Sequence, residues 1–440
     1  MTGFGFFQPS VQGMSGHSHA MQTISGNIAN VTTNAYKRSE TSFSTVLSRT
    51  YSSAPANGGL SGPLSAQSDI GGIMAKDNIR IRNSGEISGT GRELDLAITG
   101  AGFFVLNTEL NGSGNEIYGR DGALHIAAGD EITLTNASSQ TFTTNEGYLA
   151  DSNGYFLQGW AADANGIITT GGATSAMRVD DYAFTDLGQP TTAASLALNL
   201  PASAASGETE SYTMQVYDDS AVARNVSIAF TKDVMPNTWT VQFSGGTGDS
   251  FSISPPDGAL TPGAGQSLNF DPFGQLTSPT SYTVAIAHVG GAATNFTLDV
   301  SQLSQWAGGF IFNDAAQDGY GPGEMASFEF DAQGRVIGSF TNGNTRPLYQ
   351  LALADFANVD GLTPLAGNVY TVSERSGAPT IGAAGSGGLG DVVPNAIESS
   401  NVDLANEFSR MIMTQNAYNS SATAFRTVNE MTEVARDLKT

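Results

Sequence analysis

The chain has 440 residues, a formal net charge of −23 at pH 7 and no cysteine. Its length exceeds the usual range of a single domain, so we expect two or three folded units. The acidic surface disfavours nucleic acid and anionic lipid as partners, and the lack of cysteine excludes disulfides, thiolate catalysis and cysteine-based metal sites.

The first predicted element is a helix within residues 11–37. Apolar side chains recur there at helical spacing, as they do on a helix face that packs against a partner. The residues of this predicted seam are Met14, Met21, Ile24, Ile28 and Val31. The asparagine-rich run over residues 27–34 indicates that the helix ends near it and that the chain then turns.

Residues 1–11 carry neither the basic start nor the apolar core of a cleavable secretory signal. No run in the chain approaches the apolar length that spans a membrane. We therefore expect no membrane insertion. The protein is expected either to stay in the cytoplasm or to be exported by a route that leaves its N-terminus intact.

The middle of the chain is predicted to be β structure. Apolar and polar residues alternate around Met214, Ile228 and Val241, as expected for three strands of an antiparallel meander. The tryptophans are expected to anchor the β cores, at Trp160, Trp239 and Trp306. Two stretches rich in small residues, 39–69 and 376–390, flank this β region and are interpreted as connectors between nested domains.

The last predicted element is the clearest helix of the sequence. No proline follows Pro394, and apolar residues recur at alternating spacings of four and three. A helix cap is expected within residues 399–401, with Asp403 and Glu407 favourable near the positive end of the helix. The residues of this second seam are Leu404, Phe408, Met411, Tyr418, Phe425 and Val428.

Each terminal helix carries one apolar stripe and has no second element of its own to cover it. An isolated helix of this length is marginally stable in water, whereas burying one large apolar side chain contributes roughly 1.5–3 kcal/mol. The helices must therefore dock on each other or on neighbouring copies, and open contacts between copies generate filaments. A helix pair that closes one globular domain remains an equal alternative at this point.

Four motifs, taken in order, resemble those of the rod–hook axial family of bacterial flagella. They lie within residues 28–37, 85–104, 118–149 and 398–404. The residues that carry the resemblance are Asn30, Tyr36, Lys37, Asp95, Gly100, Gly102, Phe103, Phe104, Asn401 and Asp403. The segment from Phe7 to Val11 is also similar to the family's export-recognition motif.

This resemblance implies a hook-type subunit with an α+β, mainly β fold. Nested β domains would project from N- and C-terminal helices that pair as a coiled-coil-like inner domain. Many copies would form a curved hollow helical polymer that acts as a universal joint and transmits motor torque to the filament. The resemblance also implies an extracellular location on the flagellum, reached through the flagellar type III export apparatus without signal cleavage. Implied partners are the distal rod, the hook cap and the hook–filament junction proteins.

The resemblance also divides the chain into segments with expected roles. The expected segments are residues 1–37 (N-terminal helix), 38–70 (stalk or linker), 71–149 (first part of the inner β domain), 150–281 (inserted outer β domain), 282–375 (return part of the inner β domain), 376–398 (glycine-rich linker) and 399–440 (C-terminal helix).

No catalytic, cofactor or metal-binding motif is recognisable. His17 and His19 lie two residues apart, which on a helix points them to different faces, and no carboxylate lies one turn away. The chain has no zinc-protease, nucleophile-elbow or phosphate-loop motif. Glu93 and Asp95 are expected on one solvated strand face rather than as a catalytic pair. We therefore predict no enzymatic activity, no metal and no cofactor.

Two alternatives to the hook subunit remain at this stage. One is another flagellar axial subunit, such as a distal rod protein, which the chain length and the stalk segment disfavour. The other is a secreted β-rich adhesin with a coiled-coil stalk, which would bind its ligand as a monomer or trimer.

Overall fold

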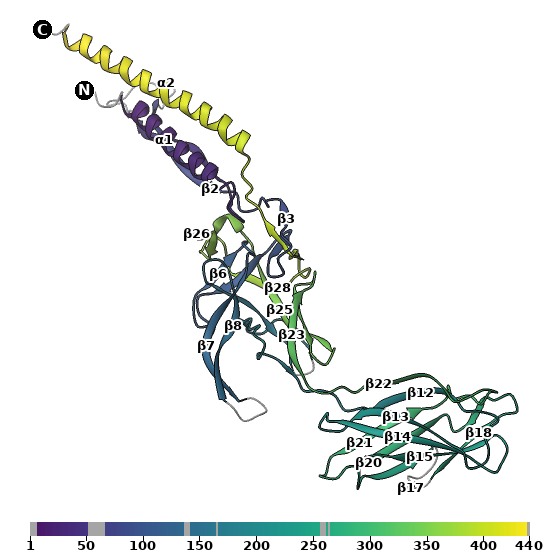
Figure 1. The fold of residues 1–440 in the computed structure, drawn as a ribbon. Coiled ribbons are helices and arrows are strands. Elements are labelled where there is room, and N and C mark those ends of the chain that lie inside the picture. Colours follow the sequence, from purple (N-terminus) through teal and green to yellow (C-terminus); the bar gives the residue numbers. More distant parts are fainter. Residues whose placement is uncertain are drawn as a thin grey trace, which may run out of the picture. The chain divides into compact units, whose positions relative to one another are not determined.

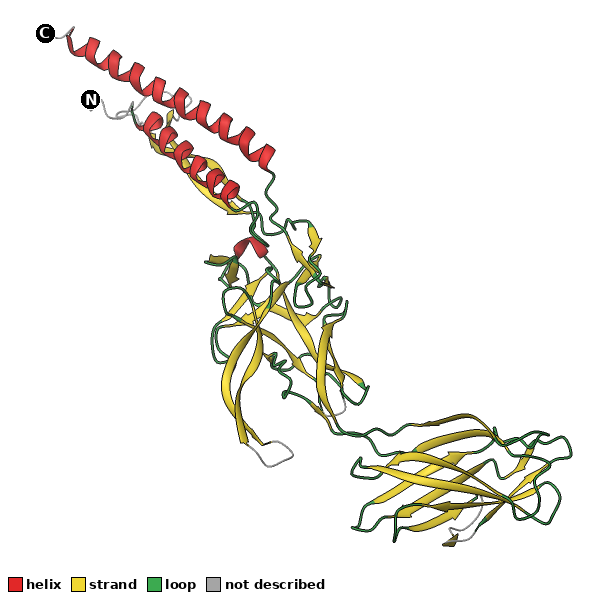
Figure 2. Ribbon diagram, in the orientation of Figure 1, coloured by secondary structure: helices red, strands yellow, loops and turns green. Residues whose placement is uncertain are grey.

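The computed structural model describes residues 7–51, 67–135, 141–163, 166–255, 261–262 and 265–437. It is mainly β, with helix α1 (Gln8–Ala29) near the start of the chain and helix α2 (Leu404–Asp437) near its end (Figures 1 and 2). The predicted fold class is confirmed. The strands follow one another in the middle of the chain, and the two helices at its ends pack against each other.

The chain forms two compact units. We call the first the terminal unit, because it holds both ends of the chain; it comprises residues 1–180, 328–337 and 346–440. The second, the inserted unit, comprises residues 181–327 and 338–345.

Helix α1 begins beside a proline and ends at Ala29, where Asn30 caps it. Pro9 occupies the first turn, where a missing backbone N–H costs nothing. At the other end the backbone N–H and the side-chain Nδ2 of Asn30 both donate to the carbonyl of Gly26, at 3.2 and 2.9 Å. The predicted stop is thus confirmed, and Val31 lies beyond the helix, in the turn that follows.

The stretch that follows α1 is a β-hairpin and not a simple connector. Strands β1 (Ser39–Tyr51) and β2 (Gln67–Ile79) pair antiparallel, and α1 packs on them. A Cβ added at Gly16 of α1 would lie 3.1 Å from Ile73 and 3.2 Å from Phe43. The connector expected over residues 39–69 therefore differs from the structure at its strands, while its middle, residues 52–66, lies outside the described residues.

Besides the β1–β2 hairpin, the terminal unit contains one large sheet and two further strand pairs. Strands β3 and β30 form one pair, and β4 and β29 form the other. In the large sheet β25, β9, β5, β6, β27 and β26 are neighbours in that order, and the β7–β8 hairpin joins through β9. The bounds are β3 Ile87–Gly89, β4 Leu96–Thr99, β5 Phe103–Asn107, β6 Glu116–Gly119, β7 His125–Thr135, β8 Thr141–Ala150, β9 Phe156–Ala161, β10 Ser175–Ala176, β25 Thr345–Phe356, the 3₁₀ turn η2 Val359–Gly361, β26 Thr363–Leu365, β27 Val369–Thr371, β28 Pro379–Ala383, β29 Asp391–Pro394 and β30 Ala396–Glu398. Trp160 is buried in this unit, as predicted.

The second expected connector also contains strands. Strand β28 lies inside the glycine-rich stretch and pairs with β25. Strands β29 and β30 follow, still within residues 376–398. Glycine-rich composition indicated a loose linker, but many of these glycines instead serve the turns between short strands, as Gly385 (φ 71°) does. The chain thus returns through paired strands before it enters α2.

The inserted unit is a two-sheet β-sandwich. One sheet has the order β17, β16, β20, β21, β12, β22, and the other has the order β13, β14, β15, β18, β19. The bounds are β11 Thr185–Asp186, β12 Ala193–Asn199, β13 Thr209–Tyr217, β14 Ala223–Lys232, β15 Thr238–Ser244, β16 Ser250–Ser254, β17 Thr261–Pro262, β18 Gln266–Phe270, β19 Leu276–Ser278, β20 Ser281–Ala287, β21 Ala293–Asp299 and β22 Ile311–Gln317; β23 Gly323–Phe330 and β24 Arg335–Phe340 carry the chain between the two units.

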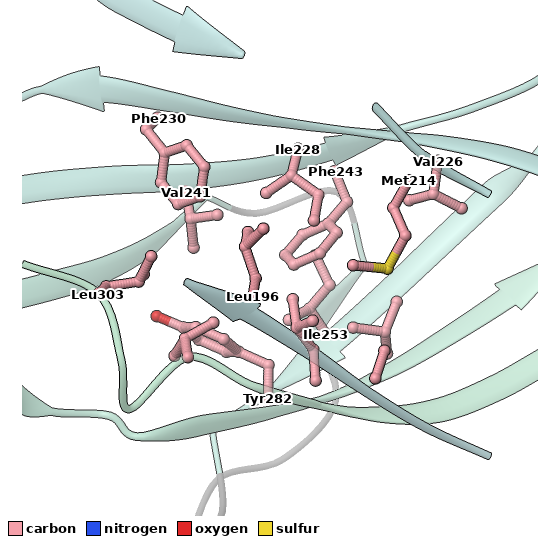
Figure 3. Close-up of a cluster of buried hydrophobic side chains, with 14 of the residues drawn as sticks. Leu196, Met214, Val226, Ile228, Phe230, Val241, Phe243, Ile253, Tyr282 and Leu303 are labelled. Atoms are coloured by element: carbon pink, nitrogen blue, oxygen red, sulfur yellow. The ribbon is translucent and has the colours of Figure 1, made fainter. Parts of the chain in front are cut away.

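The core of the sandwich lies between its two sheets. Leu196, Ile253 and Tyr282 of one sheet point toward Ile228 and Val241 of the other (Figure 3). The antiparallel meander predicted around Met214, Ile228 and Val241 is confirmed in strands β13 to β15. Trp239 is fully buried, as predicted, but the expectation for Trp306 was wrong, because its side chain is 51% exposed.

The boundaries of the inserted unit differ from the expected outer domain, residues 150–281. Strands β9 and β10 belong to the terminal unit, whereas β20 and β21 pair with β16 and β12 of the sandwich. Alternation of apolar and polar residues identifies a strand but not the sheet that it joins. For that reason the expected start, residue 150, precedes the observed start at residue 181, and the expected end, residue 281, precedes the end of the first segment at residue 327.

Candidate assembly interface

Mostly small residues make up the buried side of α1. The buried positions are Gly13, Gly16, Ala20, Ile24 and Asn27; Gly13 lies against α2, whereas Gly16 lies against the β1–β2 hairpin. At Gly13 an added Cβ would lie 3.0 Å from Ser421 Oγ of α2, so the two helices approach closely there. Near the start of α1 the rings of Phe7 and Phe425 are in contact, with their centroids 5.2 Å apart.

The predicted seam of α1 lies partly beside this face. Ile24 is buried, whereas Met14, Met21 and Ile28 are half-buried on the flank of the helix. The predicted seam contained only large apolar side chains, so the small residues of the buried face were not predicted. The signal was present as the spacing of the buried residues, which is three, four, four and three.

The predicted seam of α2 is divided between two faces. Met411, Tyr418, Phe425 and Val428 are half-buried, but Leu404 and Phe408 are exposed. A repeat of 3.5 residues drifts by about 20° per heptad around a straight helix with 3.6 residues per turn. The first residues of the stripe therefore lie away from the face that the last residues share.

Beneath the helices, side chains from both ends of the chain meet in a polar cluster that we call the joint. Asn27 of α1 is buried; its Nδ2 donates to Glu407 Oε2 of α2 at 3.0 Å and to the carbonyl of Ser39 at 2.8 Å. The hydroxyl of Tyr36 donates to Asn27 Oδ1 at 3.2 Å. Burial and the nearby Glu407 carboxylate raise the pKa of Tyr36.

The joint continues into an ion-pair network around Glu40. This carboxylate accepts from Arg410 of α2 at 2.6 Å, from Arg80 at 2.7 Å and from Arg38 at 2.9 Å. The hydrogen bond from Arg410, with smaller contributions from Arg80 and Arg38, lowers the pKa of Glu40 from 4.5 to about 2, although burial opposes this shift. Glu40 therefore stays ionised and ties the β1–β2 hairpin to α2.

At its deepest point the joint holds a buried pair between Lys37 and Glu398. The carboxylate of Glu398 also accepts from the backbone N–H of Gly85 at 2.7 Å and from Arg120 Nη1 at 3.3 Å. Burial lowers the pKa of Lys37 and of Arg120, and the charge of Glu398 opposes both shifts. Three donors from separate segments thus converge on one carboxylate.

Asn401 and Asp403 fix the entry into α2. Asn401 accepts from the backbone N–H of Arg38 at 2.7 Å, and its Nδ2 donates to the carbonyls of Arg80 and Asn83. Asp403 Oδ1 accepts from the N–H of Ala405 at 2.9 Å and so caps the helix. The structure thus places the cap at Asp403, just after the expected range of residues 399–401.

The remaining signature residues lie in the β part of the terminal unit. Gly100 and Gly102 adopt φ values of 98° and 122°, which favour glycine, and Phe103 and Phe104 are buried in β5. Asp95 was expected to be solvated, but it is 1% exposed and accepts from Thr90 Oγ1 at 2.7 Å. A hydrogen-bonded bridge to Ala123 draws this segment into the fold and covers the carboxylate.

Of the signature residues, Tyr36, Lys37 and Asn401 lie in the joint. Asn30 instead bonds back to Gly26 at the end of α1, and Asp403 caps α2. The contacts of the other joint residues were not predicted from the sequence; these residues are Asn27, Glu40, Glu398, Glu407, Arg120 and Arg410. The available signal was Glu398, a carboxylate that directly follows apolar residues within a family motif. The sequence does not reveal its partners, because they lie hundreds of residues away.

The arrangement is structural and carries no sign of a reactive centre. In the part of the chain that the structure describes, no three His, Asp or Glu side chains are grouped as a metal site. Neither described helix is long and apolar enough to cross a membrane. The charges of the joint are paired with one another and hold segments together.

Two family models match the chain. That of the flagellar basal body protein FlaE D2 domain covers residues 185–320, within the inserted unit, and that of the flagellar basal body rod FlgEFG protein C-terminal region covers residues 393–438. The flagellar hook protein FlgE of Rhizobium meliloti is 29% identical, and that of Brucella abortus is 30% identical; both alignments cover 100% of this chain and 100% of the relative. The chain belongs to the flagellar hook protein family.

Hook-family membership decides between the alternatives. The protein is a structural subunit of the flagellar hook and not an enzyme, and the rod and adhesin alternatives are set aside. The crystal structure of Helicobacter pylori flagellar hook protein FlgE2 is 13% identical, with a TM-score of 0.43; the alignment covers 71% of this chain and 100% of that chain.

Proposed function

We propose that this hook subunit assembles through its terminal helices into a curved, hollow helical polymer. In this proposal α1 and α2 of many copies build the inner tube, and the β units project from it and slide past those of neighbouring copies. The polymer would act as the universal joint that passes motor torque to the filament. Family membership supports the hook polymer, and the exposed face of α2 supports this route of assembly.

The observation that carries the proposal is an unpartnered apolar stripe on α2. Phe408 is 51% exposed and Ile412 is 60% exposed, although α1 covers the opposite side of the same helix. The stripe begins at Leu404, and further along α2 Met413, Met431 and Val434 are exposed as well. Burying each such side chain contributes roughly 1.5–3 kcal/mol, so contact with another copy would be strongly favourable.

The test replaces Phe408 by Asp. Because Phe408 does not contribute to a buried core, Phe408→Asp should fold normally but should fail to form tubes in electron micrographs. Ser409→Asp is the matched control, since it adds the same charge at the neighbouring exposed position of α2. Normal tubes from Phe408→Asp, or equal loss in both variants, would count against the proposed seam.

We further propose that the protein works outside the cell and is exported by the flagellar type III apparatus without signal cleavage. The distal rod, the hook cap and the hook–filament junction proteins would be its neighbours in the flagellum. Phe7 and Val11 would belong to the export signal. Val11 is exposed on α1, whereas Phe7 lies against Phe425, so recognition of both would precede the docking of α2.

A further inference from the structure

The turn between strands β5 and β6 contains an asparagine that is followed by a glycine, Asn111–Gly112. In such a pair the backbone nitrogen of the glycine can attack the side-chain amide carbon of the asparagine, because glycine has no Cβ to hinder the approach. Two other Asn–Gly pairs lie wholly within the described residues, at Asn153 and Asn342. The three asparagines differ in their hydrogen bonds, and this difference determines how readily each side chain reacts.

The hydrogen bonds of Asn111 favour attack on its side chain. Its Oδ1 accepts from the backbone N–H of Ser113 at 3.0 Å and from the Ser113 hydroxyl at 2.7 Å. Negative charge develops on this oxygen when a nucleophile adds to the amide carbon, and donors that already point at the oxygen stabilise that charge. The leaving group, Nδ2 of Asn111, makes no hydrogen bond to the described residues, and the residue is exposed to water.

The other two asparagines are held through their amide nitrogens instead. Asn153 Nδ2 donates to the Asp151 carboxylate at 2.9 Å and to a backbone carbonyl at 3.0 Å. Asn342 Nδ2 donates to the Asp186 carboxylate at 3.0 Å and to a backbone carbonyl at 2.9 Å, although its Oδ1 also accepts one backbone N–H. These bonds must break before the nitrogen can leave, and bonds to a charged carboxylate are the stronger kind. Both side chains are therefore protected.

Exposure to water does not account for the difference, because Asn153 is exposed as Asn111 is. The attacking nitrogen differs as well. The N–H of Gly112 donates to a backbone carbonyl at 3.3 Å, whereas the N–H groups of Gly154 and Gly343 do so at 3.0 and 2.9 Å. A longer bond of this kind is weaker, so the nitrogen of Gly112 is released most readily. Both the attacking and the leaving nitrogen are thus held least firmly in the β5–β6 turn.

We propose that Asn111 is a site of spontaneous deamidation, which proceeds through a cyclic imide with the backbone nitrogen of Gly112. That nitrogen forms a bond to Cγ of Asn111, the bond from Cγ to Nδ2 breaks, and the proton of the Gly112 N–H leaves with the amide nitrogen as ammonia. Water then adds to either carbonyl carbon of the imide and opens it to aspartate or isoaspartate. The folded chain thus modifies itself, with water as the only co-reactant.

The reaction changes the charge and the backbone of the turn. The Ser113 hydroxyl also lies 2.7 Å from Glu109 Oε2, so the new carboxylate at position 111 arises beside an existing one and is repelled by it. Isoaspartate in addition inserts its side-chain carbon into the backbone. Both changes concern residues between Asn107 and Glu116, the last pair that joins β5 to β6. The modification therefore alters an exposed turn and leaves the paired strands in place.

The first experiment follows the three asparagines in one sample. The purified full chain is incubated in mildly alkaline buffer, below the concentration at which polymer grows, and peptide mapping by mass spectrometry measures the exchange of NH₂ for OH at each site. Asn111 should convert about tenfold faster than Asn153 and Asn342, a ratio that corresponds to the net contribution of about one hydrogen bond. The same chain unfolded in urea is the control, and there the three rates should be similar.

The second experiment removes one of the two donors at Asn111 Oδ1. Ser113→Ala deletes the hydroxyl and keeps the backbone N–H, so the conversion of Asn111 should slow by roughly three- to tenfold in the folded chain. The rates at Asn153 and Asn342 in the same variant are the internal controls and should not change. In urea, Ser113→Ala should have little effect, because the turn that aims the hydroxyl at Asn111 is lost.

Two results would overturn the proposal. One is that Asn111 in the folded chain converts no faster than Asn153, since both are exposed and only their hydrogen bonds differ. The other is an unchanged rate at Asn111 in Ser113→Ala, which would mean that the donors of Ser113 do not activate the amide. Because both experiments use unassembled protein, they are independent of the proposed assembly through the terminal helices.

Discussion

At the scale of single residues, the joint depends on charges that are withdrawn from water. Lys37 and Glu398 are almost fully buried, and each is the other's main compensation. Removing one partner of a buried ion pair typically costs 3–5 kcal/mol, because the remaining charge stays buried without it. The joint is therefore sensitive to single substitutions, although its charges do not by themselves make the fold stable.

Replacing Lys37 by Met should lower the free energy of unfolding of the terminal unit by about 3–5 kcal/mol. Calorimetric melting of the full chain would measure this effect. Lys76→Met is the control, because Lys76 is exposed and should change the melting temperature little. A melting curve unchanged by Lys37→Met would show that the pair does not hold the joint.

The pH dependence of the joint follows from Glu40. Its pKa is lowered from 4.5 to about 2, so its ion pairs add stability above pH 4.5, and this stability is lost as the pH falls through about 2. Glu40→Gln should therefore be less stable than the unmodified protein at neutral pH, and the difference should vanish near pH 2. Thermal melting between pH 6 and pH 2 measures it; a constant difference would contradict the account.

At the scale of elements, the close approach of α1 and α2 depends on small residues. A Cβ added at Gly13 would already lie 3.0 Å from Ser421 Oγ, so a larger side chain would clash with α2. A Cβ added at Gly26 has no neighbour within 4 Å. Overpacking of this kind costs typically 1–3 kcal/mol. The same substitution at the two positions thus separates helix packing from helix propensity.

We expect Gly13→Leu to lower the free energy of unfolding of the terminal unit by about 1–3 kcal/mol. Gly26→Leu should be neutral or slightly stabilising, because glycine is a poor helix former. Circular dichroism melting of both variants tests the difference. Equal melting temperatures would mean that the helices can move apart without cost.

The elements themselves were largely predictable, but their contacts were not. Periodicity placed both helices and the strands around Ile228, since these signals are local. It missed the hairpin after α1, because serine- and threonine-rich strands resemble linkers in composition. It also assigned Leu404 and Phe408 to one seam with Phe425, because a heptad pattern does not show how a single helix rotates relative to its partner. The contacts of Lys37 and Arg120 with Glu398 could not be predicted from the sequence, since they join segments hundreds of residues apart.

At the scale of the whole molecule, the two units have separate cores. The sandwich core draws only on residues of the inserted unit, and Trp239 is fully buried within it. A fragment of residues 181–327 should therefore fold alone and melt cooperatively. Circular dichroism during urea unfolding measures this. Trp239→Ala in the fragment should abolish or strongly weaken the transition, since deleting such a buried ring costs about 3–5 kcal/mol.

We expect the terminal helices, and not the β units, to drive assembly of the hook polymer. Electron microscopy of the purified protein with and without residues 404–440 distinguishes the two. The full chain should grow into tubes, whereas the truncated protein should keep its β structure by circular dichroism and remain unassembled at every concentration. Tubes formed by the truncated protein would contradict the account.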